Sequence, residues 1–380
     1  MPLPSSQRTI APESLGKVLV IRPRFVGDLC LTTPVLTHLA RLAPQAAIHY
    51  IAEEEAAPLL ADDPRLERLW VTSRKATALD TARLCGALRR EKFDLVLDLF
   101  CNPRTALWTA TTGARWRVGY PNKRLRSAAY NIMVRPTEKS AVKFHLASLE
   151  ALGWDAPYVA PRIFLSDAER SAAWNHLAER GVPAGTGLIG FHPGARWPTR
   201  RWAPEDFVAL GKTLLAERPR DWLLVFGGPG EEELARTIAS QIGSPRALPI
   251  VGVALRRFAA LTQLCRAFIA GDSGPMHVAA AVGTRTIGIF GRNEPERFFP
   301  YLETEGHRSV YAKVWCSPCH RDECDHLSCL RAISPDWVWD VVRKTLQQEV
   351  SIPVGLADGP VPTHVLGAPR KPAAPAGGPA

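Results

Sequence analysis

Short apolar segments alternate with amphipathic segments along most of this 380-residue chain. The segments 17–22, 94–99, 187–191, 222–226 and 286–290 are rich in Val, Ile and Leu, and stretches with helical spacing of apolar residues lie between such segments. Continuous apolar strands separated by amphipathic helices are typical of a parallel sheet that is covered on both faces. The alternation therefore predicts an α/β fold.

The alternation falls into two series, which is what a chain of this length accommodates as two domains. The first series ends near residue 160 and the second begins at 187, and each predicts a doubly wound, Rossmann-like domain. The predicted organisation is a disordered tail (1–15), an N-terminal domain (16–160), a linker (161–186) that reads as a strand, a helix and a Gly/Pro hinge, a C-terminal domain (187–350) and a disordered tail rich in Pro, Ala and Gly (351–380).

Charge and hydropathy limit the setting in which the protein acts. Lys and Arg number 47 against 37 Asp and Glu, a formal net charge of +10, and hydrophobic residues make up 46%. No run reaches the length of about 18 apolar residues that a membrane span needs, and the first residues contain no apolar signal core. We expect a soluble intracellular protein, whose positive charge serves either solubility or attraction to an anionic surface, a polyphosphate or a nucleic acid.

The loops that follow the strands are the candidate sites, since ligands of open α/β sheets bind at the carboxyl ends of strands. Two such domains predict a cleft between these loops. The first loop, 22–28, has Gly27 at a sharp turn and Asp28 beside a helix N-terminus. Asp28 is either a helix-capping carboxylate or a general base. The absence of a G-x-G-x-x-G fingerprint in this loop disfavours a nicotinamide enzyme.

The loop 192–202 contains three arginines and two tryptophans before a helix. Backbone N–H groups near Gly194, together with Arg196, Arg200 and Arg201, are suited to binding a phosphate. The alternative is a solvated basic loop whose tryptophans pack on the core.

Two further loops contain Gly beside acidic or polar residues. In the loop 226–233, Glu231 and Glu232 either complement a helix dipole or accept hydrogen bonds from a ribose.

The segment 271–277 reads G-D-S-G-P-M-H, with Asp272 or Ser273 as the helix cap and His277 inside the helix as a core residue or a ligand. The free N–H groups at such a helix start, near Gly274, bind phosphate.

These loops together predict a phosphorylated donor. No D-x-D pair occurs in the chain, so a metal-chelated sugar nucleotide of the carboxylate kind is unsupported. The arginines would neutralise the leaving diphosphate instead.

Four of the eight cysteines lie in the segment 315–330, at Cys316, Cys319, Cys324 and Cys329. The spacing C-x2-C-x4-C-x4-C admits a structural zinc ion, an iron–sulfur cluster or two disulfides, of which disulfides are least expected inside a cell. The other cysteines, at 30, 85, 101 and 265, are predicted to be buried thiols.

The segments KVLVIRPRFVGDLCLTTPVLTHL, HPGARWPTRRWAPEDF, FGGPGEEE and GDSGPMHVAAAVGTRTIGIFG together resemble glycosyltransferase family 9, the heptosyltransferases of lipopolysaccharide core assembly. The resemblance runs from about residue 17 to about residue 345. It implies a GT-B fold with two Rossmann-like domains facing a central cleft, the acceptor on the N-terminal domain and the sugar nucleotide on the C-terminal one. It further implies inverting, metal-independent transfer of heptose from ADP-heptose to Kdo-lipid A or to a heptosylated core.

The resemblance also implies roles for particular residues. Asp28 matches the general base and Gly27 the turn that presents it, while Asp272, Ser273 and Gly274 match the phosphate-binding helix start. Glu231 or Glu232 resembles the ribose-contacting acid. Arg200 stands where the family commonly has Lys in W-P-x-K-R-W, so that a forked guanidinium replaces a point charge.

Basic residues of the N-terminal domain are candidates for binding an anionic glycolipid acceptor at the cytoplasmic face of the inner membrane; they are Arg22, Arg24, Arg104, Lys123, Arg124 and Arg126. No cofactor is expected for catalysis, and no nucleic-acid partner. The alternatives are a transferase of the same fold that uses another sugar nucleotide or glycosylates a protein, a catalytically silent binding module, and a nucleic-acid-binding module with a zinc-like knuckle.

Overall fold

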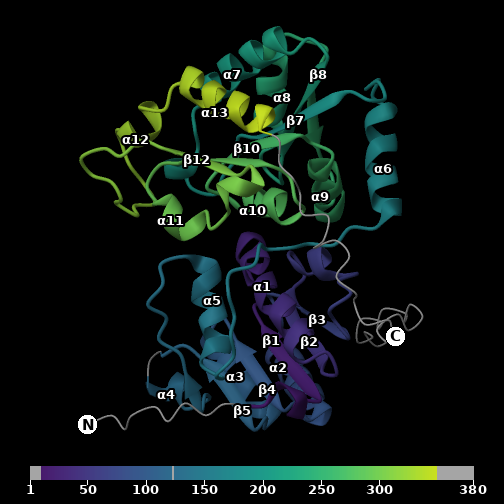
Figure 1. Ribbon diagram of the computed structural model, residues 1–380, viewed down its shortest axis with the longest axis vertical. Helices are drawn as coiled ribbons and strands as arrows, with labels where there is room; N and C mark the ends of the chain where they lie inside the picture. The colour runs from purple at the N-terminus through teal and green to yellow at the C-terminus, as the bar shows by residue number, and fades with distance from the viewer. Residues whose placement is uncertain (1–9, 122–123, 349–380) are drawn as a thin grey trace. The chain divides into compact units, whose positions relative to one another are not determined.

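The computed structural model describes residues 10–121 and 124–348, with the backbone alone at 124 and 125. The strands of this part of the chain form two six-stranded sheets in which every neighbouring pair is parallel, and helices cover both faces of each sheet (Figure 1). The prediction of two doubly wound parallel sheets is confirmed. The predicted tail over 351–380 and residues 1–9 lie outside the described residues.

The first sheet has the strand order β3-β2-β1-β4-β5-β6. Its strands are β1 (Lys17–Ile21), β2 (Ala47–Glu53), β3 (Arg68–Thr72), β4 (Leu95–Asp98), β5 (Trp116–Gly119) and β6 (Ile132–Met133). Its helices are α1 (Val26–Leu42), α2 (Ala78–Glu91), α3 (Pro103–Thr112), α4 (Arg124–Ser127) and α5 (Ala141–Glu150), with 3-10 helices η1 (Pro12–Ser14) and η2 (Ala57–Leu60). The order reverses between β1 and β4, which is where ligands bind in such sheets.

The second sheet has the order β12-β11-β10-β7-β8-β9, which reverses between β7 and β10. Its strands are β7 (Gly187–His192), β8 (Asp221–Gly227), β9 (Ala247–Val251), β10 (Ala267–Gly271), β11 (Thr286–Phe290) and β12 (Arg308–Tyr311). The helices around it are α6 (Asp167–Ala178), α7 (Pro204–Glu217), α8 (Glu232–Ile242), α9 (Leu255–Gln263), α10 (Gly274–Ala281), α11 (Pro295–Phe298), α12 (Ser328–Arg331) and α13 (Pro335–Gln347), with 3-10 helices η3 (Pro198–Arg200) and η4 (Glu303–Glu305).

Helix α1 is buried on nearly all sides, which is unusual for a helix that covers a sheet. It packs against α5 of its own half and against α10 of the second half. One hydrophobic core therefore runs from Leu29 and Cys30 of α1 to Met276 of α10 and Tyr301 beyond it. The two sheets share apolar surface through this helix pair.

Residues 10–15 are folded, and the prediction that they belong to a disordered tail is wrong. Ile10 and Leu15 are buried, and the backbone N–H of Ile10 donates to the carbonyl of Leu152 at 3.0 Å. The Trp154 indole in turn donates to the Ile10 carbonyl at 2.6 Å. Two apolar side chains and an indole partner are enough to hold this short segment against the first sheet's helices.

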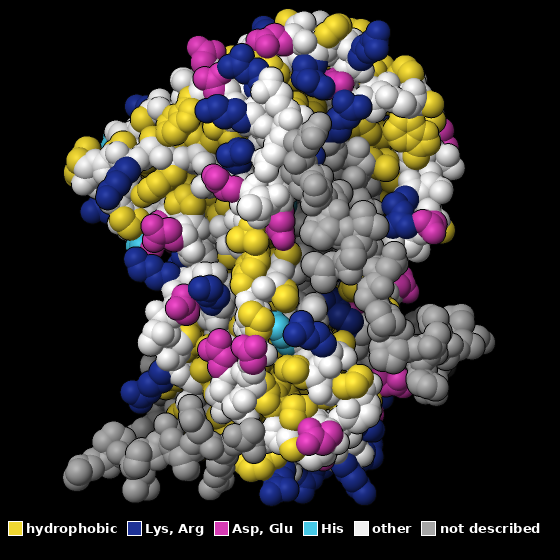
Figure 2. Space-filling view, viewed as in Figure 1, with side chains coloured by type: hydrophobic (Ala, Val, Ile, Leu, Met, Phe, Trp, Pro, Cys, Tyr) yellow, Lys and Arg dark blue, Asp and Glu magenta, His cyan; other side chains and the backbone are white. Residues whose placement is uncertain are grey.

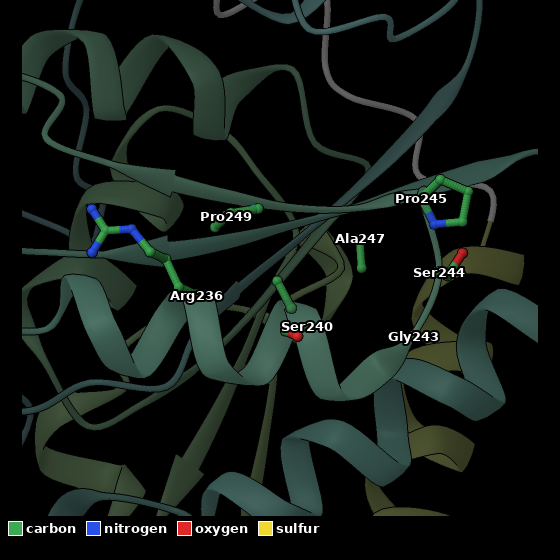
Figure 3. A pocket seen from close by; sticks show the side chains of 8 residues that line it. Arg236, Ser240, Gly243, Ser244, Pro245, Ala247 and Pro249 are labelled. Carbon is green, nitrogen blue, oxygen red and sulfur yellow. The ribbon is translucent and has the colours of Figure 1, made fainter.

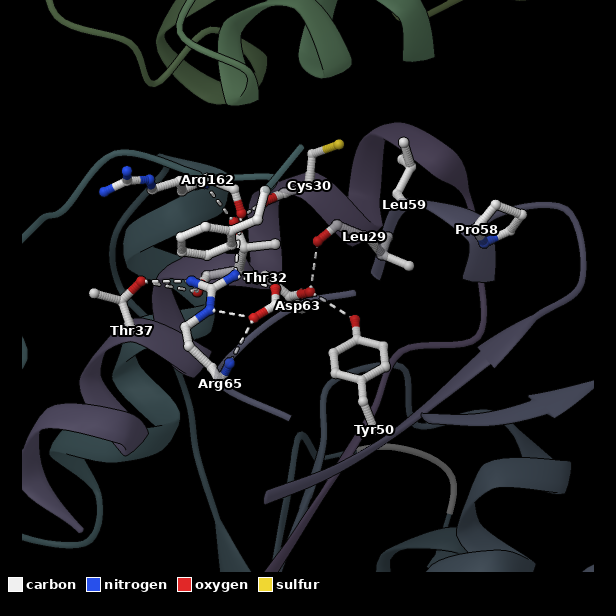
Figure 4. A network of polar contacts seen from close by, with 12 residues as sticks. Leu29, Cys30, Thr32, Thr37, Tyr50, Pro58, Leu59, Asp63, Arg65 and Arg162 are labelled. Carbon is white, nitrogen blue, oxygen red and sulfur yellow. Dashed lines mark hydrogen bonds and ion pairs between the residues drawn. The ribbon is translucent and has the colours of Figure 1, made fainter. Parts of the chain in front are cut away.

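The strand predicted at the start of the 161–186 linker is also absent, because side chains and a helix end take its backbone groups. Thr33 accepts the N–H of Arg162 at 2.9 Å, and Arg65 donates to the Arg162 carbonyl at 3.1 Å (Figure 4). The N–H of Ile163 donates to the carbonyl of Ala281 in α10 at 2.8 Å. The segment is thus an irregular strap, and the helix predicted after it is α6.

Among residues 10–121 and 124–348, no helix is long and apolar enough to cross a membrane. On the face drawn in Figure 2, Lys and Arg side chains are interspersed with Asp and Glu rather than gathered in one basic patch.

Candidate functional site

Asp28 lies in the first turn of α1, three residues after the N-cap residue Phe25. One carboxylate oxygen accepts the Phe25 N–H at 3.3 Å, and the other pairs with the Arg22 guanidinium at 2.6 Å. Arg22 is itself held by the carbonyl of Leu99 at 2.6 Å. The Asp28 side chain nevertheless stays 36% exposed. The helix start thus orients the carboxylate, which remains accessible from outside. This geometry is compatible with both interpretations of Asp28, the helix-capping carboxylate and the general base.

Gly27 brings this carboxylate next to the second half of the molecule. A Cβ atom at position 27 would lie 2.6 Å from the His277 ring and 3.2 Å from the backbone of Gly274, closer than real Cβ contacts. Only glycine fits this approach between the first turns of α1 and α10. The loop after β1 and the loop after β10 therefore meet at Gly27.

The long loop after β7 sends its three arginines in different directions. Arg200 lies 3.3 Å from the Asp272 carboxylate, with its side chain 24% exposed. Arg196 is exposed and reaches the first half, where its guanidinium lies 5.7 Å from the Phe25 ring centre. Arg201 donates to the carbonyl of Ala195 at 2.5 Å and lies at the surface. Arg200 is the one that the structure joins to Asp272.

The electrostatics of Arg200 connect the two halves. Burial lowers the pKa of Arg200, and the negative charge of Asp272 opposes that shift. The charge of Asp28, in the first half, acts on Arg200 in the same direction as Asp272. The predicted base and the predicted phosphate-binding arginine therefore lie within electrostatic range of each other.

Asp272 and Ser273 precede α10 and differ in role. Asp272 is buried, and its carboxylate accepts a hydrogen bond of 2.6 Å from the Asn293 amide. Ser273 is the N-cap residue, but its hydroxyl makes no capping bond, and its oxygen is buried without a hydrogen-bond partner among the described residues. A helix of eight residues with Gly274 and Pro275 in its first turn leaves backbone N–H groups free, which suits an anion.

His277 is a buried residue of α10 rather than an open ligand. Its Nδ1 lies 2.7 Å from the Tyr301 hydroxyl. Burial lowers the pKa of His277, while the charges of Asp272 and Asp28 oppose this shift. His277 thus sits between the two acids as a neutral packing and hydrogen-bonding group.

Glu231 and Glu232 separate clearly in the structure. The Glu231 carboxylate lies 3.4 Å from Nε2 of the buried His192 and accepts the Gly228 N–H at 3.2 Å. It also fills the space beside Gly194, where an added Cβ would lie 2.1 Å from the carboxylate carbon. Glu232 accepts the N–H of Gly230 at 2.8 Å within its own turn. Glu231 is the acid that faces the β7 loop.

The arginines predicted to bind an acceptor gather where β1, β2 and β4 end. Arg24 and Arg104 each lie 4.0 Å from the buried carboxylate of Glu53, on opposite oxygens. Arg104 also donates to the hydroxyl of Thr72 at 2.8 Å, and burial lowers its pKa. Arg126 donates to the Cys101 carbonyl at 3.4 Å. Lys123 and the side chain of Arg124 lie outside the described residues.

Phe25 is exposed, and guanidinium groups from three loops surround it. Arg24 lies 5.6 Å, Arg74 5.8 Å and Arg196 5.7 Å from its ring centre. Cation–π contacts at this range hold arginine side chains without neutralising their charge. The rim of the site beside Asp28 is therefore strongly basic.

The cysteine-rich segment 315–330 lies against this site rather than apart from it. All eight cysteines are free thiols; Cys329 is buried, and Cys316, Cys319 and Cys324 are half-buried. The prediction of buried thiols is confirmed at Cys30, Cys101 and Cys265 and wrong at Cys85, which is half-buried on α2. In the part of the chain that the structure describes, no three His, Cys, Asp or Glu side chains are arranged to hold a metal ion.

A shallow hollow of about 370 Å³ lies elsewhere, between α8 and the start of β9 (Figure 3). Its lining includes Arg236, Ser240, Ser244 and Pro249, and none of the predicted site residues. The hollow is open to solvent and is lined mainly by small residues. The candidate site is therefore identified from its charges and contacts, and it does not coincide with this hollow.

Four residues that sequence reasoning did not single out belong to the same arrangement. Glu53 holds two arginines, Tyr301 contacts His277, Asn293 contacts Asp272, and Arg292 acts electrostatically on Arg200. Arg292 and Asn293 directly follow the strand–glycine segment TIGIFG, a position at a strand's carboxyl end that could have marked them.

Known proteins resemble this chain over most of its length. The profile of "Glycosyltransferase family 9 (heptosyltransferase)" matches residues 81–329. Lipopolysaccharide heptosyltransferase 3 of Escherichia coli is 27% identical over 283 residues, covering 71% of this chain and 82% of that protein. The profile match begins within α2 and does not include the Asp28 loop.

Two solved structures show the same fold. The E. coli ADP-heptose lipopolysaccharide heptosyltransferase II superposes with a TM-score of 0.73 at 23% identity, covering 88% of this chain and 99% of that one. The E. coli heptosyltransferase WaaC with ADP-2-deoxy-2-fluoro heptose superposes with a TM-score of 0.66 at 21% identity, covering 86% and 99%.

Proposed function

The chain belongs to glycosyltransferase family 9, and on this premise we propose that it transfers heptose from ADP-heptose to the inner core of lipopolysaccharide. The GT-B fold that its motifs implied is confirmed by the two parallel sheets and by the solved structures they resemble. The relatives that carry the printed names of lipopolysaccharide heptosyltransferases support the donor and the acceptor class.

The observation that carries the proposal is the approach of the Asp28 loop to the α10 helix start at Gly27. An accessible carboxylate on one side of this contact and a cationic, N–H-rich helix start on the other provide the two groups that a direct displacement needs. The first half would bind the acceptor and the second half the sugar nucleotide.

In the proposed reaction, Asp28 removes the proton from an acceptor hydroxyl as that oxygen attacks the anomeric carbon of the donor sugar. The bond between that carbon and the diphosphate breaks on the opposite face, which inverts the configuration. Arg200 and the free N–H groups at Ser273 and Gly274 stabilise the charge that develops on the departing diphosphate. Glu231 is placed to accept hydrogen bonds from the nucleoside. No metal ion takes part in these steps.

In this proposal, Arg22, Arg24, Arg104 and Arg126 bind the anionic groups of a glycolipid acceptor. Guanidinium groups bind phosphates and carboxylates bidentately, and the inner core and lipid A present such groups. This assigns the enzyme to the cytoplasmic face of the inner membrane as a peripheral protein, with the sugar nucleotide drawn from the cytoplasm.

The four cysteines of the segment 315–330 are proposed to hold a structural zinc ion or iron–sulfur cluster. The spacing C-x2-C-x4-C-x4-C supports this proposal, and the four cysteines are free thiols rather than disulfides. Thiolates are the ligands that such ions prefer. Metal analysis of the purified protein, with and without the substitution Cys319→Ser, tests this part separately from catalysis.

Calorimetric titration with ADP, GDP and UDP tests the donor assignment. We expect selective binding of ADP that weakens in Arg200→Gln and stays unchanged in Arg220→Gln, which removes an exposed arginine between α7 and β8. Preference for UDP or GDP would contradict the heptose donor while keeping the fold. Transfer from ADP-heptose to a heptose-deficient core, unaffected by a chelator, completes the test, and a metal requirement for turnover would contradict the mechanism.

A further inference from the structure

Arg292 is a buried arginine that lies at the carboxyl end of β11, next to the loop that carries Arg200. Its side chain is only 7% exposed. It follows Gly291, where an added Cβ would lie 2.8 Å from the carbonyl oxygen of Thr199. At Gly271, at the end of β10, an added Cβ would lie even closer to a backbone oxygen, 2.3 Å from the carbonyl of Arg200. The 3-10 turn η3 therefore packs directly on the ends of both strands.

The guanidinium of Arg292 is held on one side and free on the other. Its Nη1 pairs with the Asp322 carboxylate and lies 3.5 Å from the carbonyl of His320. Its Nε is buried and has no hydrogen-bond partner among the described residues. The Nε of Arg200 is in the same state. A buried N–H without a partner is costly, so two such groups on loops that pack against each other indicate an absent acceptor.

The charges around these two arginines point to the sign of that acceptor. Arg292 lowers the pKa of Arg200, as expected for two guanidinium groups at close range, whereas the charge of Asp322 opposes this. Arg292 and Arg196 also lie at the same indole, 5.9 and 5.2 Å from the Trp197 ring. Several cations converge here with an unused donor edge, and a dianionic group would relieve their repulsion.

The cysteine-rich segment fixes Arg292 in this position. The backbone N–H groups of Cys319 and His320 donate to the Arg292 carbonyl at 3.2 and 3.3 Å. The carbonyl of Asp322 accepts the Thr199 hydroxyl at 3.2 Å, which joins the segment to η3. His320 lies 3.1 Å from the Asn293 amide oxygen, and Asn293 holds Asp272. The cysteine-rich segment thus contacts Arg292 itself, and it reaches Arg200 indirectly through Thr199 and Asn293.

We propose that Arg292 is a further donor-binding residue, whose free Nε edge binds the diphosphate of the sugar nucleotide beside Arg200, and that Asp322 is the positioning residue that orients it. This inference rests on the proposed function for the origin of the diphosphate. It gives the cysteine-rich segment a role in the site that does not depend on a metal ion.

Titration of Arg292→Gln with a nucleoside diphosphate and with the matching nucleoside tests the proposal. Loss of a charge-assisted hydrogen-bonding partner should raise the dissociation constant of ADP about 10- to 100-fold, with that of adenosine within about twofold of wild type. Arg297→Gln removes the same charge from an exposed arginine five residues along and should change neither. Unchanged ADP affinity in Arg292→Gln, or equal loss of ADP and adenosine, would overturn the assignment.

Arg292→Lys guards against a folding defect, because it keeps the buried charge opposite Asp322 but lacks the second donor edge. We expect a wild-type melting temperature with ADP affinity between those of wild type and the glutamine variant. A folded lysine variant with wild-type affinity would show that the fork makes no contact, and would contradict the proposal.

Asp322 is tested by its own series. Asp322→Asn should raise the KM for the donor about threefold to tenfold at unchanged kcat, and Asp322→Glu should restore it, since a displaced guanidinium loses one of its directed hydrogen bonds. Asp325→Asn, in the same exposed segment, is the matched control. Equal KM values in Asp322→Asn and wild type would remove the positioning role.

Running GDP and UDP in parallel separates this inference from the proposed function. If wild type prefers one of these to ADP, the heptose donor is wrong, but weaker binding of that nucleotide by Arg292→Gln still supports the diphosphate contact. Wild-type protein that binds none of the three would overturn both.

Discussion

Strands β4 and β10 hold corresponding places in their sheets, each beside the strand that begins its half, and each leads into a buried acid. Asp98 ends β4 and Asp272 follows β10, with 0% and 2% of their surface exposed. The Asp98 carboxylate accepts hydrogen bonds from neutral donors, among them the Tyr130 hydroxyl at 2.7 Å and the Cys101 N–H at 2.8 Å. Asp272 is bound by the Arg200 cation and the Asn293 amide.

The comparison shows that the sheet topology determines where each buried acid lies, whereas its hydrogen-bond and ion-pair partners determine its role. Burial raises the pKa of Asp98, and its neutral donors only partly offset this, so it serves the loop that it organises. Asp272 instead holds the guanidinium of Arg200, whose Nε has no hydrogen-bond partner among the described residues. The acid that we propose to be reactive in the first half is Asp28, which follows β1, the neighbour of β4 in the sheet, and is 36% exposed. Three variants or groups of variants test this contrast.

The largest effect is expected at Asp28, the accessible acid. Asp28→Asn keeps an oxygen that can accept the Phe25 N–H but has no basic carboxylate, so kcat should fall roughly 100- to 10,000-fold. Steady-state transfer from ADP-heptose measures it, with circular dichroism to establish the fold. Turnover within threefold of wild type would assign the proton transfer to another group.

Two buried histidines, one in each half, should make the protein acid-labile. Burial lowers the pKa of His49 and of His307 to about 4, and each Nδ1 accepts a hydrogen bond at 3.2 Å, from the Trp70 indole and the Thr286 N–H respectively. Below pH 6.5 these two histidines become protonated in the unfolded chain, whereas in the folded chain they stay neutral down to about pH 4. Stability should therefore fall between pH 6.5 and about 4, by up to roughly 3 kcal/mol per histidine.

Urea unfolding at a series of pH values measures this loss. His49→Gln and His307→Gln should each flatten the profile, and His326→Gln, on the cysteine-rich segment, should leave it as in wild type. A profile that neither of the first two changes would show that other groups control the acid transition.

The smallest effects separate Asp98 from Asp272 directly. Asp98→Asn sets an amide N–H against existing donors and should cost about 1 to 3 kcal/mol of unfolding free energy without changing ADP affinity. Asp272→Asn should weaken ADP binding about tenfold, because Arg200 loses its partner, with the smaller loss of stability. We expect Asp98→Asn to lower the melting temperature more than Asp272→Asn does, and Asp272→Asn to lower the calorimetric ADP affinity more than Asp98→Asn does. If one variant showed the larger loss in both measurements, the contrast between Asp98 and Asp272 would be contradicted.

Much of the fold followed from the alternation of apolar and amphipathic segments. Strands β7 and β11 lie within one residue of their predicted bounds, 187–191 and 286–290. Each is a case in which local propensity and burial agree. The start of the 161–186 linker was predicted as a strand, which the structure does not show. Its hydrogen-bond partners come from α1, α10 and Arg65, distant in sequence and invisible to a local pattern.

The candidate site was partly readable for the same reason. Asp28, Arg200 and Asp272 lie in loops with recognisable glycines and arginines, and the structure brings them together. Glu53 could not be predicted, because its importance comes from pairing with arginines of other loops. Arg292 could have been marked by its place after a strand, but its pairing with Asp322 could not be predicted. The split between Glu231 and Glu232 likewise depended on His192, which only the folded chain places beside one of them.

The burial of α1 against α10 has a consequence for synthesis on the ribosome. Helix α1 ends at Leu42 and α10 begins at Gly274, so the first half leaves the exit tunnel long before its partner helix exists. At ordinary elongation rates that interval lasts roughly 10 to 50 seconds. Throughout it, an apolar helix face stays open to water and to other nascent chains. We expect truncated first halves to require a chaperone, and the chain to become safe from aggregation only when the second sheet arrives.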